Sequence, residues 1–178
     1  EPIEVKESVS RFELPLKDWA TTGTKGQRKP NIINSLALDP AELEKHNIHL
    51  QEKYSAMKEN EVKYEAYNLE NAEVVIVAYG TTSRIVRNAI IDLKEQGINV
   101  GLIRPITLWP FPEKAFDLIP SDCKAVLSVE MSMGQMIDDI KIAVNGRYPV
   151  HFYGRSGGMI PTPEGVMNKV KELVGGAK

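Results

Sequence analysis

The stretch Glu73-Val-Val-Ile-Val-Ala-Tyr-Gly-Thr-Thr-Ser83 constrains the fold of this chain more than any other. Its five residues from 74 to 78 are all apolar, a pattern that is typical of a strand covered on both faces by helices. Gly80 lets the backbone turn, and the hydroxyl side chains of 81–83 can cap a helix that starts at about Thr82. The stretch therefore predicts a buried strand over 74–79 that leads directly into a helix.

The chain after this stretch repeats the order of strand, turn and helix. Apolar runs predict further strands at 99–103, 125–129 and 150–153, and helices at 83–96, 113–118, 134–145 and 162–175. Such alternation with short links predicts parallel strands joined by right-handed crossovers. The expected fold class is a three-layer α/β/α sandwich over residues 73–178, with an extension over residues 1–72.

The extension has three expected parts. Residues 1–38 are irregular, with apolar anchors that suggest a strap lying on a folded body, and Asp39-Pro40 opens a long helix expected to reach about Tyr67. The helix either lies on its own domain or forms an arm that contacts another subunit. Within the strap, a glycine-rich loop carries three cations without an acid, and it is either a solvated linker or a loop that closes on an anion across an interface. The three cations are Lys25, Arg28 and Lys29.

Composition excludes several classes of function. A net charge of -2 argues against nucleic-acid binding, and no run of 18 apolar residues predicts a membrane span. No signal peptide is evident in the first 20 residues, and the single cysteine, Cys123, excludes an internal disulfide and a metal or iron–sulfur site made from this chain's thiolates alone. These features favour a cytoplasmic protein, and a start at Glu1 rather than Met suggests a segment of a longer polypeptide.

The carboxyl ends of the predicted strands should form the working edge of the sheet. The turn Gly80-Thr81-Thr82 at a helix N-terminus is either a simple cap or a weak anion site, because it matches no dinucleotide or P-loop fingerprint. Arg104 and Glu130 end two strands that we expect to be neighbours, and they could pair across the edge. Such a pair would lower the carboxylate's pKa and make it a poor general base.

The loop Gly154-Arg155-Ser156-Gly157-Gly158 carries more features of a contact site than any other segment of that edge. Its three glycines allow close approach of another molecule, and Arg155 can hold an anion, so ligand and subunit contacts are both compatible with it. Ser156 lacks a nearby base and a matching nucleophile elbow, which argues against a hydrolase. No complete catalytic constellation is present, so the residues by themselves indicate a binding or assembly domain.

Longer motifs give a specific resemblance. The run Arg104-Pro-Ile-Thr-Leu-Trp-Pro-Phe-Pro112, with Val129-to-Gln135 and Phe152-to-Gly158, resembles the transketolase C-terminal-like domain of 2-oxoacid:ferredoxin oxidoreductase α subunits. The 2-ketoisovalerate type is the most similar, over roughly residues 10–175. The resemblance implies a sheet of about five strands, one of them antiparallel, with the fifth strand coming from the strap or from residues near 31–36.

The resemblance also implies a function. The complete enzyme would decarboxylate a 2-oxoacid oxidatively with coenzyme A and pass electrons to ferredoxin. It would use thiamine diphosphate, Mg²⁺ and iron–sulfur clusters held outside this chain, on a missing N-terminal pyrimidine-binding domain and on β and γ/δ subunits. This chain would then act in assembly and help shape a substrate or coenzyme A channel, and it would be inactive alone. The alternative is a free-standing α/β module that binds an anion at the Gly80 and Arg155 loops.

Overall fold

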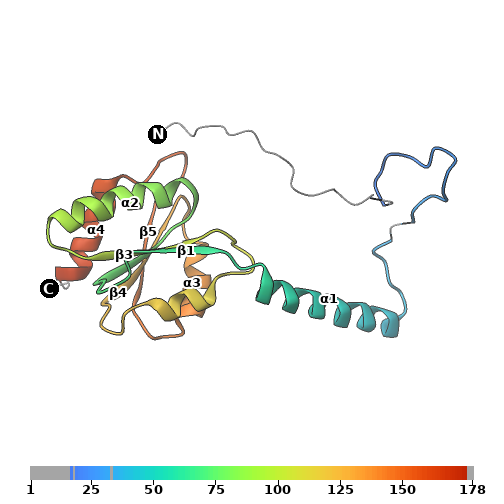
Figure 1. Ribbon diagram of the computed structural model, residues 1–178, viewed down its shortest axis with the longest axis horizontal. Helices are drawn as coiled ribbons and strands as arrows, with labels where there is room; N and C mark the ends of the chain where they lie inside the picture. The colour runs from blue at the N-terminus through green and yellow to red at the C-terminus, as the bar shows by residue number, and fades with distance from the viewer. Residues whose placement is uncertain (1–16, 18, 33, 176–178) are drawn as a thin grey trace. The chain divides into compact units, whose positions relative to one another are not determined.

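The computed structural model describes residues 17, 19–32 and 34–175. The chain divides between Asn47 and Ile48 into two units, and each unit is described by itself (Figure 1). Residues 1–16, 18 and 33 of the strap lie outside the described residues, so the prediction that the strap packs on a folded body stays a prediction.

Helix α1 (Pro40–Asn60) crosses the boundary between the two units. It begins as expected, because the Asp39 carboxylate accepts hydrogen bonds from the backbone N–H groups of Ala41 and Glu42. No residue of α1 is buried, and its Tyr54 ring meets the Trp109 ring edge-on at 5.5 Å. The helix ends at Asn60, so the prediction that it reaches Tyr67 is wrong.

Five strands form one mixed sheet in the order β1-β3-β2-β4-β5. β2, β3, β4 and β5 are mutually parallel, and β1 pairs antiparallel with β3 at the edge of the sheet. The strands run over Tyr64–Tyr67 (β1), Val74–Val77 (β2), Val100–Pro105 (β3), Ala125–Glu130 (β4) and Val150–Gly154 (β5).

β1 is the fifth strand, and the expectation that the strap or residues 31–36 supply it is wrong. The segment that was assigned to the end of the long helix leaves the helix at Asn60 and returns along β3, with Tyr64 opposite Pro105 and Tyr67 opposite Leu102. Two tyrosines in four residues suit an edge strand better than a helix. The sheet therefore begins before residue 73, where the sequence placed the start of the α/β domain.

Helices cover both faces of the sheet. α2 (Gly80–Glu95) and α4 (Pro163–Gly175) lie on one face, and α3 (Met136–Val144) with the 3₁₀ helix η1 (Glu113–Leu118) lies on the other (Figure 1). Val74 and Ile76 belong to the core under α2 and α4, while Val75 and Val77 belong to the core under α3 and η1. The unbroken apolar run of β2 therefore follows from burial on both sides, and the three-layer α/β/α fold is confirmed.

The two ends of the strands define two edges of the domain. The carboxyl edge consists of the segments that follow β2, β3, β4 and β5, at 78–80, 106–112, 131–135 and 155–160. The amino edge consists of the segments that precede these strands, at 68–73, 96–99, 119–124 and 145–149. Because β1 is antiparallel, the chain enters the sheet from α1 at the carboxyl edge, where Ile106 and Thr107 donate backbone hydrogen bonds to the Lys63 carbonyl.

Candidate functional site

The carboxyl edge carries large apolar side chains that water reaches. Each segment of the edge contributes at least one, and together they follow the order of the strands across the sheet. Met133, which follows β4, has 79% of its surface exposed. The other members are Tyr79, Ile106, Leu108, Trp109, Met131, Met159 and Ile160. Exposed apolar residues gathered on one edge are typical of a surface that another protein segment covers.

Glu130 lies beneath this surface and organises it. Its carboxylate is 4% exposed and accepts hydrogen bonds from the hydroxyls of Ser128 and Ser132, each at 2.8 Å. The backbone N–H groups of residues 135–137 also donate to it, at 2.9 to 3.1 Å. The carboxylate therefore caps the N-terminus of α3 and fixes the loop that carries Met131 and Met133.

These five donors determine the charge of Glu130. Burial by itself would raise the pKa of the carboxyl, but the hydrogen bonds from Gln135, Ser128, Ser132 and Met136 outweigh burial and hold the pKa below its usual range. The group is therefore a carboxylate at neutral pH. Because all its donors are fixed parts of the fold, it is suited to holding the loop rather than to accepting a proton from a substrate.

The predicted pair between Arg104 and Glu130 is wrong. β2 lies between β3 and β4, so the two residues do not end neighbouring strands. The Arg104 guanidinium instead binds the carboxylate of Glu65 on β1 at 3.1 Å, and Arg87 of α2 binds the same carboxylate at 2.8 Å. The error arose because consecutive strands in the sequence were taken as neighbours in space, and the sheet inserts β2 between them.

The loop after β5 packs on the loop after β4. The Arg155 N–H donates to the Glu130 carbonyl at 3.1 Å, and the Ser156 hydroxyl contacts the Met133 sulfur at 3.4 Å. A Cβ on Gly154 would collide with the Ser132 carbonyl and the Phe152 ring. The first glycine of the loop thus serves close packing within this chain, and the serine has a sulfur, not a histidine, as its hydrogen-bond partner.

The last two glycines of that loop have a different role. Gly157 and Gly158 adopt positive φ angles of +63° and +87°, and a Cβ at either position would meet no atom within 4 Å. The Arg155 side chain forms no ion pair within the described residues. These three residues therefore remain available for a contact outside this chain.

The turn after β2 differs from its prediction in detail. α2 begins at Gly80, which has a φ of +56°, and Tyr79 at the N-cap position makes no side-chain capping bond. Thr81 is exposed, whereas Thr82 and Ser83 are buried, and the Ser83 hydroxyl donates back to the Gly80 carbonyl at 2.7 Å. None of these hydroxyls caps the helix as expected, because the helix starts before them.

The basic loop belongs to the first unit. The Arg28 guanidinium donates to the carbonyls of Ala20, at 3.0 Å, and Lys29, at 3.3 Å, so it closes its own loop. Lys25 and Lys29 are exposed. The two readings of this loop, linker or anion contact, both stay open, since the structure does not relate the first unit to the carboxyl edge.

Within the described ranges, no group of three or more histidine, cysteine, aspartate or glutamate side chains is arranged to hold a metal ion. Over the same part of the chain, no helix has both the length and the apolar character needed to cross a bilayer.

The geometry defines a class of protein: a three-layer α/β/α domain whose carboxyl edge exposes a row of large apolar side chains. Comparison with known proteins gives the family. The sequence model of the pyruvate:ferredoxin oxidoreductase core domain II family matches residues 72–166. Because this match covers more than half of the sequence, the chain belongs to that family.

Individual relatives agree with this assignment. The chain is 43% identical over 176 residues to the ketoisovalerate oxidoreductase subunit VorB of Methanothermobacter marburgensis, covering 98% of this chain and 49% of that protein. The structure resembles a 2-oxoglutarate:ferredoxin oxidoreductase from Magnetococcus marinus, with a TM-score of 0.62 and 27% identity over 78% of this chain and 24% of that one. A split-gene transketolase, at 16% identity, 62% and 41% coverage and a TM-score of 0.50, shares the fold. The chain thus spans about half the length of its VorB relative.

The structure also identifies residues that the sequence did not single out. Ser128 and Ser132 lie two residues on either side of Glu130, and both hold its carboxylate. A serine inside an otherwise apolar strand is a signal that could have led to this arrangement. Glu65, the partner of Arg104, could not have been found in the same way, because its strand was assigned to a helix.

Proposed function

We propose that this chain is part of the α subunit of a 2-oxoacid:ferredoxin oxidoreductase that acts on 2-ketoisovalerate. Membership of the core domain II family supports the enzyme class, and 43% identity to VorB across nearly the whole chain supports the substrate. The complete enzyme would form an acyl-coenzyme A from the 2-oxoacid with release of CO₂ and pass two electrons to ferredoxin. The single cysteine fits a reducing, cytoplasmic setting.

The cofactors of such an enzyme would lie outside this chain. One cysteine cannot supply the thiolates that hold an iron–sulfur cluster. Of the acidic residues on the carboxyl edge, Glu130 is already committed to five donors of its own fold. Thiamine diphosphate and Mg²⁺ would therefore sit on the N-terminal pyrimidine-binding domain and the β subunit, and this chain alone would be inactive.

The role that we propose for this chain is assembly through the carboxyl edge. The observation that carries it is the row of eight exposed apolar side chains there, which a partner would remove from water. The N-terminal domain and the β and γ/δ subunits are the partners that the family supplies. Arg155 and the two open glycines would face the same junction, where the anionic groups of a 2-oxoacid or of coenzyme A pass.

Co-purification tests this role. Met133→Asp places a charge in the proposed interface, and Ser121→Asp places the same charge on the amino edge, where the exposed Ser121 is a matched control. We expect Met133→Asp to weaken assembly with the remaining domain and subunits at least tenfold, because it buries an unpaired carboxylate, and Ser121→Asp to leave it unchanged.

Activity of the reassembled enzyme completes the test. Coenzyme A-dependent reduction of ferredoxin should be faster with 3-methyl-2-oxobutanoate than with 2-oxoglutarate. Equal assembly of the two variants would refute the role of the carboxyl edge, whereas a preference for 2-oxoglutarate would refute the substrate and leave the assembly role standing.

A further inference from the structure

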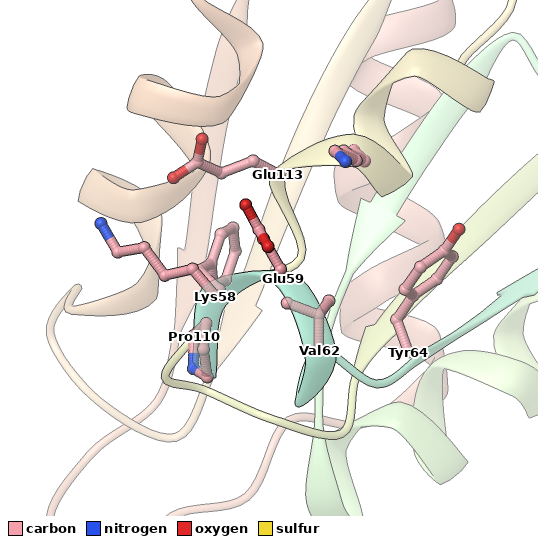
Figure 2. A pocket seen from close by; sticks show the side chains of 8 residues that line it. Lys58, Glu59, Val62, Tyr64, Pro110 and Glu113 are labelled. Atoms are coloured by element: carbon pink, nitrogen blue, oxygen red, sulfur yellow. The ribbon is translucent and has the colours of Figure 1, made fainter. Parts of the chain in front are cut away.

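A pocket opens beside the junction of α1, β1 and η1, where segment 106–112 of the carboxyl edge supplies Pro110 and Phe111. It has a volume of about 370 Å³. Val62, Pro110 and Phe111 supply the apolar part of its lining, here called the apolar floor, and Tyr64 also lines it. Figure 2 shows Lys58, Glu59 and Glu113 on the same side of Val62 and Pro110, and all three charged side chains are exposed to water.

The walls of this pocket are held in place before any ligand arrives. The Lys63 N–H donates a hydrogen bond to the Thr107 hydroxyl at 3.0 Å. That hydroxyl in turn donates to the Pro110 carbonyl, also at 3.0 Å. The Phe111 ring packs against the buried Phe116 ring at 5.8 Å between centroids. A pocket that exists in advance binds a ligand without the cost of ordering its own walls.

Four charged side chains line the pocket, and none of them is neutralised by a neighbour. Lys58 and Glu59 come from α1, and Glu113 and Lys114 come from η1. Among the ion pairs and side-chain hydrogen bonds of the described residues, none involves these four groups. Two carboxylates and two ammonium groups around one cavity can therefore receive a ligand that carries one charge of each sign.

The charge around the pocket is not evenly distributed. Asp139 of α3 has a pKa above its usual range, first because of burial and then because of the negative charges of Asp138, Glu113 and Glu130. Glu113 and Asp139 are thus close enough for their charges to interact, and both add negative charge on the side of η1 and α3. A ligand's ammonium group would be attracted to this side, and its carboxylate would be left to the lysines.

We propose that this pocket binds a free α-amino acid with an aliphatic or aromatic side chain. The ammonium group is received by Glu59 and Glu113, the carboxylate by Lys58 and Lys114, and the side chain lies on the apolar floor. The volume is sufficient for such a molecule, and an apolar cavity with a few polar groups that fix orientation is the usual form of a small-molecule site.

Calorimetric titration of the full chain with L-leucine tests the proposal. Two analogues separate its parts: 4-methyl-2-oxopentanoate keeps the carboxylate and the aliphatic body without the ammonium group, and glycine keeps both charges without the body. We expect saturable binding of leucine, and binding of each analogue at least tenfold weaker, because each lacks one of the contacts.

Variants locate the site. Glu59→Gln/Glu113→Gln should weaken leucine binding at least tenfold, while Glu70→Gln/Glu95→Gln, which changes the same charge at exposed positions of the same unit that do not line the pocket, should not. Circular dichroism confirms that both double variants fold. Absence of saturable leucine binding, equal binding of the oxoacid, or unchanged binding by Glu59→Gln/Glu113→Gln would each overturn the proposal.

Discussion

The two edges of the sheet are made by the same strands, yet they differ in what they expose. On the carboxyl edge, eight large apolar side chains are open to water. In the described segments of the amino edge, no large apolar side chain is exposed to that degree. There the surface is closed by polar contacts such as the Lys124–Glu73 ion pair at 2.8 Å and the Asn68–Asn99 hydrogen bond at 2.7 Å.

The contrast distinguishes side chains that stabilise the fold from side chains that are available for contact with another molecule. A domain needs its core and its turns wherever they lie, but it has no need of exposed methionines and a tryptophan on one edge only. In the described residues, the amino edge is closed by contacts within this chain, whereas the carboxyl edge leaves apolar side chains in water, as the proposed assembly role requires. The carboxyl edge nevertheless has a rigid base, since Glu130 fixes the loop that presents Met131 and Met133.

The largest expected effect is on the free energy of unfolding, and it comes from comparing one glutamate of each edge. Glu130→Ala should lower the free energy of unfolding by about 3–4 kcal/mol, because it leaves buried N–H and hydroxyl donors without an acceptor. Glu73→Ala removes a partly exposed ion pair and should cost under about 1 kcal/mol. Urea denaturation measures both, and similar losses would break the contrast between a buried support and a surface pair.

A smaller effect contrasts two glycines. Gly101→Ala, in β3 near the amino edge, should cost about 2 kcal/mol, because the new Cβ would lie 2.7 Å from Leu69 Cδ2 and 3.1 Å from the Asn68 carbonyl. Gly157→Ala meets open space and carries only the strain of its positive φ, about 1 kcal/mol. Thermal unfolding of the two variants ranks them, and a costlier Gly157→Ala would indicate that the carboxyl-edge loop packs on something within this chain.

The smallest effect is a dependence on pH. The pKa of Glu130 is lowered on folding, so its contribution to stability is complete above the unfolded pKa and disappears as pH falls through the folded pKa. Wild-type protein should therefore lose more stability between about pH 5 and pH 3 than Glu130→Gln, in which position 130 does not titrate. If the two proteins lose the same stability across this pH interval, the lowered pKa of Glu130 is contradicted.

Much of the fold could be predicted from the sequence. The unbroken apolar run of β2, the proline-started α4 and the caps of α1 and α4 all follow local rules, and the hydrogen bonds to Asp39 and Thr162 confirm the two caps. Strand order could not be predicted from such local rules, because it depends on crossovers between distant segments. That is why the expected Arg104–Glu130 pair failed. β1 was missed for a different reason, because its residues were assigned to the end of the long helix that Asp39-Pro40 opens.

Prediction of the site was limited for a related reason. The glycines of 154–158 were recognised, but their different roles depend on neighbours that only the fold supplies: Gly154 is packed against Ser132, and Gly157 faces open space. No sequence motif marks the pocket that Lys58 and Glu113 line, since its residues come from a helix, a strand and a loop in separate parts of the chain.

The direction of β1 has a consequence for how this surface is used. Because β1 runs against its neighbours, the polypeptide enters the sheet at the carboxyl edge, where Tyr64 lies opposite Pro105. The last turns of α1, which belong to the second unit, therefore reach the sheet beside the apolar row, and the Tyr54 ring meets the Trp109 ring of that row at 5.5 Å. One end of the row is thus already partly covered by this chain. Under the proposed assembly role, a partner has only the remainder to remove from water.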